Sequence, residues 1–267
     1  ELIDIPTNKA LYSIFTNEEG NALDDVIFWK FEDKIILIPN ASNLDKIKSH
    51  LTTHNVEYLD KSEDTVLIAV QGPDTIDLIK DRFEIPDKFS TNYTENYLYA
   101  RTGYTGEDGV EIMANNEDAE SLLTFLTEKG IKPCGLGSRD TLRLEASLPL
   151  YGFELTEDIT PVEASLSWTL TNKNDYLGSE KINNQLSGEN HKVLKKFIID
   201  SRKIARTETV GIAGETKGLV TSGNFSPILN KSIGFILFEN MPSQDLIEFD
   251  IRGNLIEGNI VNKRFLS

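Results

Sequence analysis

The stretch RTGYTGEDGVEIM, residues 101–113, carries glycine, tyrosine and acidic side chains between two apolar runs. We predict that residues 97–101 and 110–113 form the two strands of a hairpin. Gly106 and Gly109 would supply the positive φ angles that a tight turn requires. A plain turn therefore explains the glycines without any ligand.

Two side chains of this stretch exceed what a hairpin needs. Because side chains alternate along a strand, Val110 and Ile112 point to one face and Glu111 points to the other. Tyr104 precedes the second strand within the same loop. A tyrosine ring beside a carboxylate suits a flat heterocycle that carries N–H donors.

The rest of the chain predicts an α+β fold. Residues 10–38 have the pattern of three strands, and residues 65–70 that of a buried strand. Four segments are predicted to be helical, with the third ended by Gly130: residues 40–51, 74–83, 117–130 and 138–148. From about residue 184 short strands alternate with turns, which is typical of a small β-barrel or sandwich. The polar linker over residues 183–192 is a plausible domain boundary.

Composition excludes several classes of protein. The 267 residues include 39% hydrophobic ones but no run near the roughly 20 apolar residues that a membrane span needs. The net charge of −16 argues against general nucleic-acid binding. Cys134 is the single cysteine, so a reducing compartment fits, and we expect the cytoplasm or, in a eukaryote, the mitochondrial matrix. Because the sequence begins with Glu1, we expect the natural start to lie upstream.

Familiar catalytic and metal patterns are weak here. The chain has only three histidines and no Gly-x-Ser-x-Gly motif, so a nucleophilic triad is not indicated. Neither histidine nor cysteine spacing indicates a metal site. Gly135 and Gly137 precede a predicted helix without the remainder of a phosphate-binding motif, and we interpret them as a turn with Ser138 as the helix cap.

An acidic pair stands within the apolar run of residues 22–29. On a strand Asp24 and Asp25 point to opposite faces, so this pair alone does not make a metal site. Asp25 shares its face with Leu23 and Ile27. Such an acid lies either at a sheet edge or in a pocket, and the residues leave both alternatives open.

Several long motifs together resemble one family, the glycine cleavage system T-protein, a tetrahydrofolate-dependent aminomethyltransferase. The resemblance runs from Ala10 nearly to Phe265. The motifs that carry it stand in one order: residues 10–29, 69–73, 101–113, 132–155 and 221–227.

The resemblance implies a three-domain cloverleaf around a channel that holds tetrahydrofolate, with a C-terminal β-barrel. The expected domains are a folate-binding α+β domain (residues 1–65 with 142–185), an α+β domain (66–141) and the barrel (186–267). The implied reaction transfers the methylene of the aminomethyl group on the dihydrolipoyl arm of H-protein to tetrahydrofolate and releases ammonia. No metal, nucleic acid or membrane is implied.

The resemblance also assigns roles to particular residues. Asp25 matches the catalytic carboxylate, which would hold the folate amine for attack and stabilise the cationic iminium formed as ammonia leaves. Trp29 falls next to the pocket, where the family often has tyrosine. The other implied folate-binding residues are Tyr12, Asn40, Tyr104, Glu111 and Arg139.

Some residues of the matched motifs keep structural interpretations. Arg139 and Arg143 are four apart on one predicted helix face and could be paired structural cations. Yet in an acidic chain an arginine directed at an anionic cofactor has an evident use. Glu145 is expected to be a helix charge partner and Tyr151 a packing aromatic.

The sequence departs from the family at its ends and at two internal places. Some seventy residues, which normally precede residue 10 and contribute to the first domain, are absent here, and family members usually continue beyond Ser267 to a basic tail. Asn21 stands where glycine is usual, and residues 165–167 read Ser-Leu-Ser where the family favours Gly-Leu-Gly.

Two other functions remain alternatives. One is a related folate-dependent demethylase or methyltransferase. The other is a non-catalytic folate-binding protein that supports iron–sulfur cluster maintenance. The motifs at residues 101–113 and 132–155 are closest to the T-protein form, and Cys134 does not lie in the cysteine motif of the iron–sulfur group.

Overall fold

The computed structural model describes residues 5–170 and 175–266. The chain divides into two compact units. The first runs to Ser13 and resumes over Val26–Arg139, and the second comprises Ile14–Asp25 and the chain from Asp140 onward. The division of the chain into the three domains given above stays a prediction.

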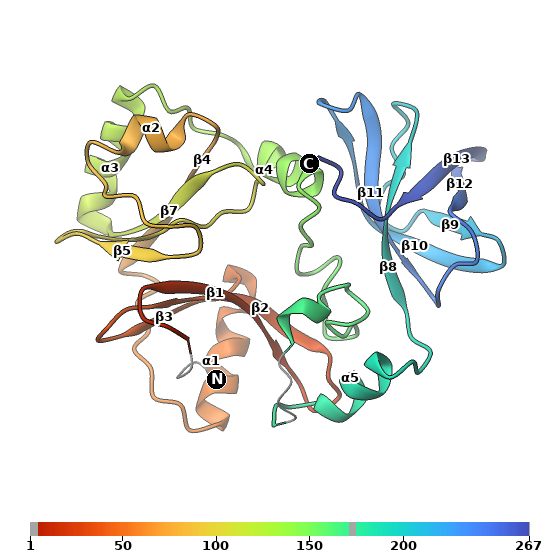
Figure 1. The fold of residues 1–267 in the computed structure, drawn as a ribbon, viewed down its shortest axis with the longest axis horizontal. Coiled ribbons are helices and arrows are strands. Elements are labelled where there is room, and N and C mark those ends of the chain that lie inside the picture. The colour runs from red at the N-terminus through yellow and green to blue at the C-terminus, as the bar shows by residue number, and fades with distance from the viewer. Residues whose placement is uncertain (1–4, 171–174, 267) are drawn as a thin grey trace. The chain divides into compact units, whose positions relative to one another are not determined.

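The first unit is built on a four-stranded antiparallel sheet of order β4-β7-β6-β5. Its strands are β4 (Thr65–Gln71), β5 (Thr91–Tyr93), β6 (Tyr97–Ala100) and β7 (Gly109–Asn115). The helices α2 (Thr75–Ile79) and α3 (Asn116–Glu128) cover one face of this sheet (Figure 1). Buried apolar side chains of both helices and the sheet form the core there, including Ile79, Tyr99, Val110, Ile112 and Leu122.

A second sheet of order β1-β2-β3 precedes it in the chain. It comprises β1 (Lys9–Thr16), β2 (Ala22–Lys30) and β3 (Ile35–Ile38), followed by the short helices η2 (Ala41–Asn43) and α1 (Leu44–Thr53). Within the first unit Ala10, Trp29 and Phe31 form a buried cluster with Ala100 of β6, and Met113 of β7 packs against it. The face of the four-stranded sheet that α2 and α3 leave uncovered therefore packs on the three-stranded sheet.

The predicted hairpin is confirmed, with one correction. Strands β6 and β7 pair from Tyr97↔Ala114 to Ala100↔Glu111. Gly106 has a φ of 80°, but Gly109 does not have a positive φ. Gly109 is required for another reason, because a Cβ atom there would lie 2.2 Å from the Val70 carbonyl oxygen of β4.

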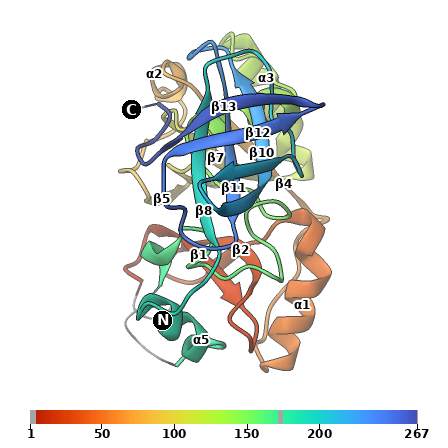
Figure 2. The same cartoon turned by 90° about the vertical axis from the view of Figure 1, so that its right-hand side faces the viewer.

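The second unit contains a closed barrel of strand order β10-β11-β8-β13-β12-β9 (Figure 2). The strands are β8 (Val193–Ile199), β9 (Val210–Ala213), β10 (Thr216–Ser226), β11 (Lys231–Phe238), β12 (Leu246–Ile251) and β13 (Asn254–Val261). Phe197, Ile236 and Phe249 are fully buried inside it. The alternative of a sandwich is thereby excluded, and the predicted α+β fold with a C-terminal barrel is confirmed.

Three further helices complete the described chain: α4 (Leu136–Glu145), η3 (Ser167–Thr169) and α5 (Ser179–Leu186). Leu144 of α4 packs with Leu194 and Phe235 on the outside of the barrel. The interpretation of Ser138 as a helix cap is wrong. Ser138 lies inside α4, and its hydroxyl donates to the Gly135 carbonyl at 2.7 Å.

Candidate functional site

Glu111 is a buried carboxylate on a sheet face that is otherwise apolar. It lies on β7 and is 7% exposed. Its partners on the neighbouring strands are both alanines, Ala69 of β4 and Ala100 of β6, so no large side chain stands beside it there. Ala69 is exposed, which leaves that side of the carboxylate open.

Within the described part of the chain, hydrogen bonds use only part of the acceptor capacity of this carboxylate. The Thr102 hydroxyl donates to Oε2 of Glu111 at 2.7 Å. Burial raises the pKa of the Glu111 carboxyl, and the Thr102 hydrogen bond and the charge of Arg139 oppose that rise without cancelling it. An ionised carboxylate offers about four acceptor positions. Glu111 is therefore an acceptor suited to a ligand with N–H donors.

Tyr104 and Arg139 form a pair near Glu111. The guanidinium carbon of Arg139 lies 4.9 Å from the centroid of the Tyr104 ring, which is a cation–π contact. The Arg139 side chain is exposed, so its N–H donors can reach a ligand. Three of the predicted site residues, Tyr104, Glu111 and Arg139, are thus brought together within the first unit.

The loop that carries Tyr104 is held by an ion pair across its base. Arg101 donates to both carboxylate oxygens of Asp108, at 3.0 and 2.6 Å. It also donates to the Pro86 carbonyl at 3.2 Å. This pairing lowers the pKa of Asp108 and raises that of Arg101. Residues 101–113 thus contain a hairpin loop, and the Arg101–Asp108 ion pair holds the loop that carries Tyr104 next to the strand that carries Glu111.

Gln71, at the end of β4, also holds this loop in place through hydrogen bonds from its side-chain amide. Its amide nitrogen donates to the carbonyls of Thr102 at 3.1 Å and of Val110 at 3.2 Å. The backbone of Gly103 approaches this amide so closely that a Cβ atom there would overlap it. Residues 69–73 belong to one of the family motifs, but the sequence alone assigns Gln71 no role. The signal in the sequence is Gly103, because a glycine allows the loop backbone to pass close to another group.

Asp24 and Asp25 lie on β2 as the alternation predicts. Asp24 is fully buried with Ala22, whereas Asp25 is half-buried on the opposite face. Strand β2 is the middle strand of its sheet. β3 pairs with β2 only from Ile27 to Lys30, so Asp25 lies beyond that pairing, and both alternatives for Asp25, a sheet edge and a pocket, stay open.

The remaining predicted residues lie in the first unit. Tyr12 of β1 is half-buried, and Asn40 precedes η2 with a half-buried side chain. Trp29 is fully buried, and its indole N–H has no hydrogen-bond partner among the residues that the structure describes. Trp29 therefore packs in the buried cluster between the two sheets, with Phe31 and Ala100. The folate contacts of these three residues stay predictions.

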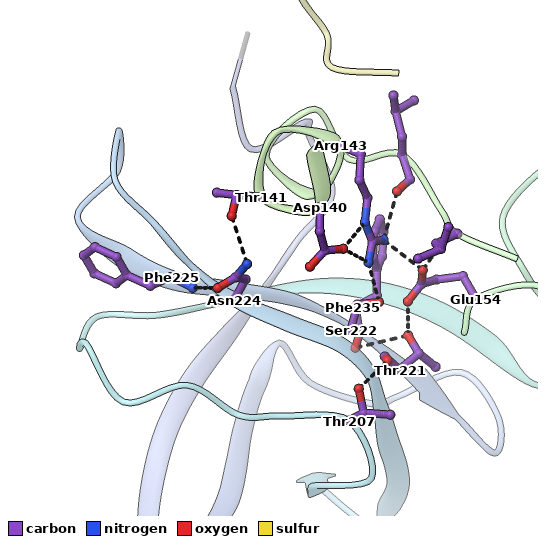
Figure 3. Close-up of polar contacts among 12 residues, drawn as sticks. Asp140, Thr141, Arg143, Glu154, Thr207, Thr221, Ser222, Asn224, Phe225 and Phe235 are labelled. Carbon is purple, nitrogen blue, oxygen red and sulfur yellow. Dashed lines mark hydrogen bonds and ion pairs between the residues drawn. The ribbon is translucent and has the colours of Figure 1, made fainter. Parts of the chain in front are cut away.

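Arg143, one helical turn beyond Arg139, has a different environment (Figure 3). It is 2% exposed and donates to Glu154 at 3.0 Å, to Asp140 at 2.9 Å and to the Ser222 hydroxyl at 2.8 Å. The interpretation as a paired structural cation holds for Arg143, whereas Arg139 is exposed and contacts the Tyr104 ring. Arg143 belongs to a buried network that joins α4 to the barrel.

Glu145 is not a helix charge partner. It is 2% exposed and accepts a hydrogen bond from the Ser226 hydroxyl. No ion pair of Glu145 is found within residues 5–170 and 175–266. Tyr151 packs against the cluster of Ala22 and Leu155, as expected of a packing aromatic.

Comparisons with known proteins agree along the chain. Residues 1–174 match the profile of the GCVT N-terminal domain, and residues 192–266 match the glycine cleavage T-protein C-terminal barrel domain. The chain is 36% identical to an aminomethyltransferase of Thermotoga neapolitana and 38% identical to one of Bacillus mycoides. These alignments cover 98% of this chain and 77% and 78% of the relatives.

A solved structure has the same fold. The glycine cleavage system aminomethyltransferase T of Bartonella henselae superposes with a TM-score of 0.89 at 25% identity, over 98% of this chain and 77% of that one. The fold and the matches define the class of protein as a one-carbon transferase with a GCVT N-terminal part and a T-protein barrel.

The chain belongs to the glycine cleavage T-protein family. The predicted resemblance is thereby confirmed, as is the expectation of an enzyme of the aminomethyltransferase type. No helix among the described residues is long and apolar enough to cross a membrane.

Proposed function

We propose that this protein transfers the methylene of the aminomethyl group on the dihydrolipoyl arm of H-protein to tetrahydrofolate. Ammonium leaves, the lipoyl sulfur regains a proton, and two folate N–H bonds are replaced by bonds to the transferred carbon. The observation that carries the proposal is the buried Glu111 carboxylate beside Thr102 and the Tyr104–Arg139 pair, in a chain of this family.

The residues present fit a reduced folate. A pterin ring presents N–H donors along one edge, and Glu111 is an acceptor with unused capacity on a face that is open at Ala69. Arg139 offers charged N–H donors to the anionic part of such a molecule. Tyr12, Asn40 and Trp29 are the further folate-binding residues of the proposal, with Tyr12 and Asn40 as contacts and Trp29 as packing behind the pocket.

Asp25 is the proposed catalytic carboxylate. As an anion in a partly desolvated setting, it can hold an amine N–H for attack and stabilise the positive charge that develops as ammonia leaves. Such stabilisation is stronger in a medium of low dielectric constant than in water. H-protein is the proposed partner, and the cytoplasm or the mitochondrial matrix is the proposed location, which the single cysteine supports.

The test is ammonia release from aminomethylated H-protein and tetrahydrofolate. We expect Asp25→Asn to lower turnover by about 10²–10⁴-fold while tetrahydrofolate still binds. Asp33→Asn, at an exposed aspartate between β2 and β3, is the matched control and should keep full activity.

Three outcomes would contradict the proposal or its assignments. Equal loss of binding and turnover in Asp25→Asn would make Asp25 a binding or structural group. Methyl transfer from a small amine or sulfonium donor, without H-protein, would favour the demethylase alternative. Folate binding with no transfer from any donor would favour the non-catalytic alternative.

A further inference from the structure

The second unit contains a cavity of about 390 Å³ that the proposed reaction does not use. Its floor is the outer surface of the barrel, and the segments over residues 146–149 and 164–168 form its walls. Pockets of about 300–1,000 Å³ are the size that holds small molecules.

Lys196 is one of the residues that line the cavity floor. It lies on β8 directly across from Phe235 of β11 and Val261 of β13, and side chains at such paired positions share one face. Phe235 and Val261 also line the cavity. An ammonium group is therefore set on an apolar floor.

Two more cations line the same cavity, Lys195 and Arg264. Burial lowers the pKa of Lys196, and the charges of Arg264 and Lys195 lower it further. The Lys196 ammonium donates a long hydrogen bond of 3.4 Å to the Asn262 carbonyl. Within the described part of the chain none of the three cations has a carboxylate partner, although the protein carries a net charge of −16.

Two serines in the cavity walls have a strained, left-handed backbone conformation. Ser147 and Ser165 have φ angles of 63° and 60°, a region in which residues other than glycine and asparagine are uncommon. Ser165 is the position where the family favours glycine. Both are held in place, since Ser165 donates to the Leu194 carbonyl and Ser147 accepts from the Phe265 amide. Retained strain of this kind is concentrated at ligand sites.

The cations are spread in a way that selects the ligand. Neighbouring residues on a strand point to opposite faces, so the Lys195 side chain points away from the face that carries Lys196, and the two cations left to hold a ligand are Lys196 and Arg264. Arg264 follows β13 and offers a planar group that suits a carboxylate. Trp168, which is 70% exposed, adds an apolar surface at one wall.

We propose that this cavity binds a small organic anion with two separated carboxylates joined by a short apolar chain. The two possible sources are a free dicarboxylate and the glutamyl part of a larger molecule. The inference does not rest on the proposed function, and its test needs neither tetrahydrofolate nor H-protein.

The experiment uses Trp168 as the reporter. The protein has two tryptophans, and Trp29 is fully buried in the first unit, so a change in emission on titration is assigned to Trp168 and checked with Trp168→Phe. The probes are glutarate, γ-glutamylglutamate and inorganic phosphate, with calorimetry as a second measurement. We expect glutarate or γ-glutamylglutamate to bind with Kd below about 1 mM, and phosphate to bind more weakly.

The variants decide whether the cavity is responsible. Lys196→Met and Arg264→Gln should each weaken binding about tenfold or more. Lys217→Met, at an exposed lysine of β10 that does not line the cavity, removes the same charge and should leave the affinity unchanged. Thermal unfolding of each variant shows that the fold is kept.

The outcomes separate the sources and can overturn the inference. Binding of glutarate indicates a free dicarboxylate, and binding of γ-glutamylglutamate alone indicates the glutamyl source. The inference is wrong if neither binds, if phosphate binds as tightly, or if Lys196→Met binds like the unaltered protein.

Discussion

Two regions of this molecule bury charge, and they do so in different ways. In the second unit Glu154 is fully buried and accepts from Arg143, from the Leu150 amide and from the Thr221 hydroxyl. In the first unit Glu111 is nearly as buried, but among the described residues only Thr102 donates a hydrogen bond to it. Both are glutamates in dry surroundings, so their difference lies in how completely their oxygens are satisfied.

That difference separates a structural charge from one that we propose binds a ligand. A buried ion pair whose members are fully hydrogen-bonded has little to gain from a ligand, and its removal leaves an uncompensated charge. A buried carboxylate with unused acceptor capacity keeps a raised pKa, and perturbed groups of this kind are concentrated at functional sites. The same comparison holds for the two arginines of α4, since Arg143 is enclosed and Arg139 is exposed.

The largest expected effect comes from breaking the satisfied region. Arg143→Met leaves the Glu154 carboxylate buried without its cation, and we expect the free energy of unfolding to fall by about 3–5 kcal/mol. The matched control is Arg139→Met, the same change on the same helix at an exposed site, which should cost at most about 1 kcal/mol. Urea unfolding of the two variants measures both values.

A double variant sharpens the result. Arg143→Met combined with Glu154→Gln removes both charges, so most of the lost stability should return. If the double variant is as unstable as Arg143→Met, packing of the arginine stem rather than an unpaired charge is the cause. If Arg139→Met costs as much as Arg143→Met, the contrast between the two regions fails.

The sequence predicts this contrast only in part. Period-two alternation correctly places Glu111 opposite Val110, and it correctly puts Asp24 and Asp25 on opposite faces. The sequence of α4 does not show that Arg139 is exposed and Arg143 buried. The partners that bury Arg143 include Ser222, which is 79 residues away in the chain.

Contacts that depend on strand register also could not be predicted, because they join residues that are not neighbours in the chain. Thr102 reaches Glu111 because β6 and β7 pair in one particular register, and Gln71 reaches the loop because β4 pairs with β7. The role of Gly109 was misassigned, since its need is close approach to β4 rather than a turn angle. The family motifs identified the site residues without showing what holds them.

A smaller effect is expected from removing the hydrogen bonds by which Gln71 holds the loop near Glu111. Gln71→Glu places carboxylate oxygens against the carbonyls of Thr102 and Val110, which the Gln71 amide now satisfies. We expect a loss of about 1–3 kcal/mol in stability and a rise of about tenfold in the Kd for tetrahydrofolate, with a smaller change in kcat. Calorimetry measures the Kd, and steady-state kinetics measures kcat.

The uncharged variant Gln71→Met is the control and should show a smaller rise in the Kd for tetrahydrofolate. Equal losses in Kd and kcat would show that Gln71 does more than position the loop.

The smallest expected effect is the pH dependence of stability that Glu111 contributes. Its folded-state pKa is raised above the ordinary value of 4.5, so the protonated form is favoured in the folded state. The resulting stability is fully present below the ordinary pKa and is lost as the pH rises through the raised one. Relative to Glu111→Gln, the unaltered protein should therefore lose stability as the pH rises above about 4.5, as measured by urea unfolding. Thr102→Val removes a hydrogen bond that lowers this pKa, so the loss should extend to higher pH. A difference between the unaltered protein and Glu111→Gln that stays constant as the pH rises would mean that burial does not raise the pKa of the Glu111 carboxyl.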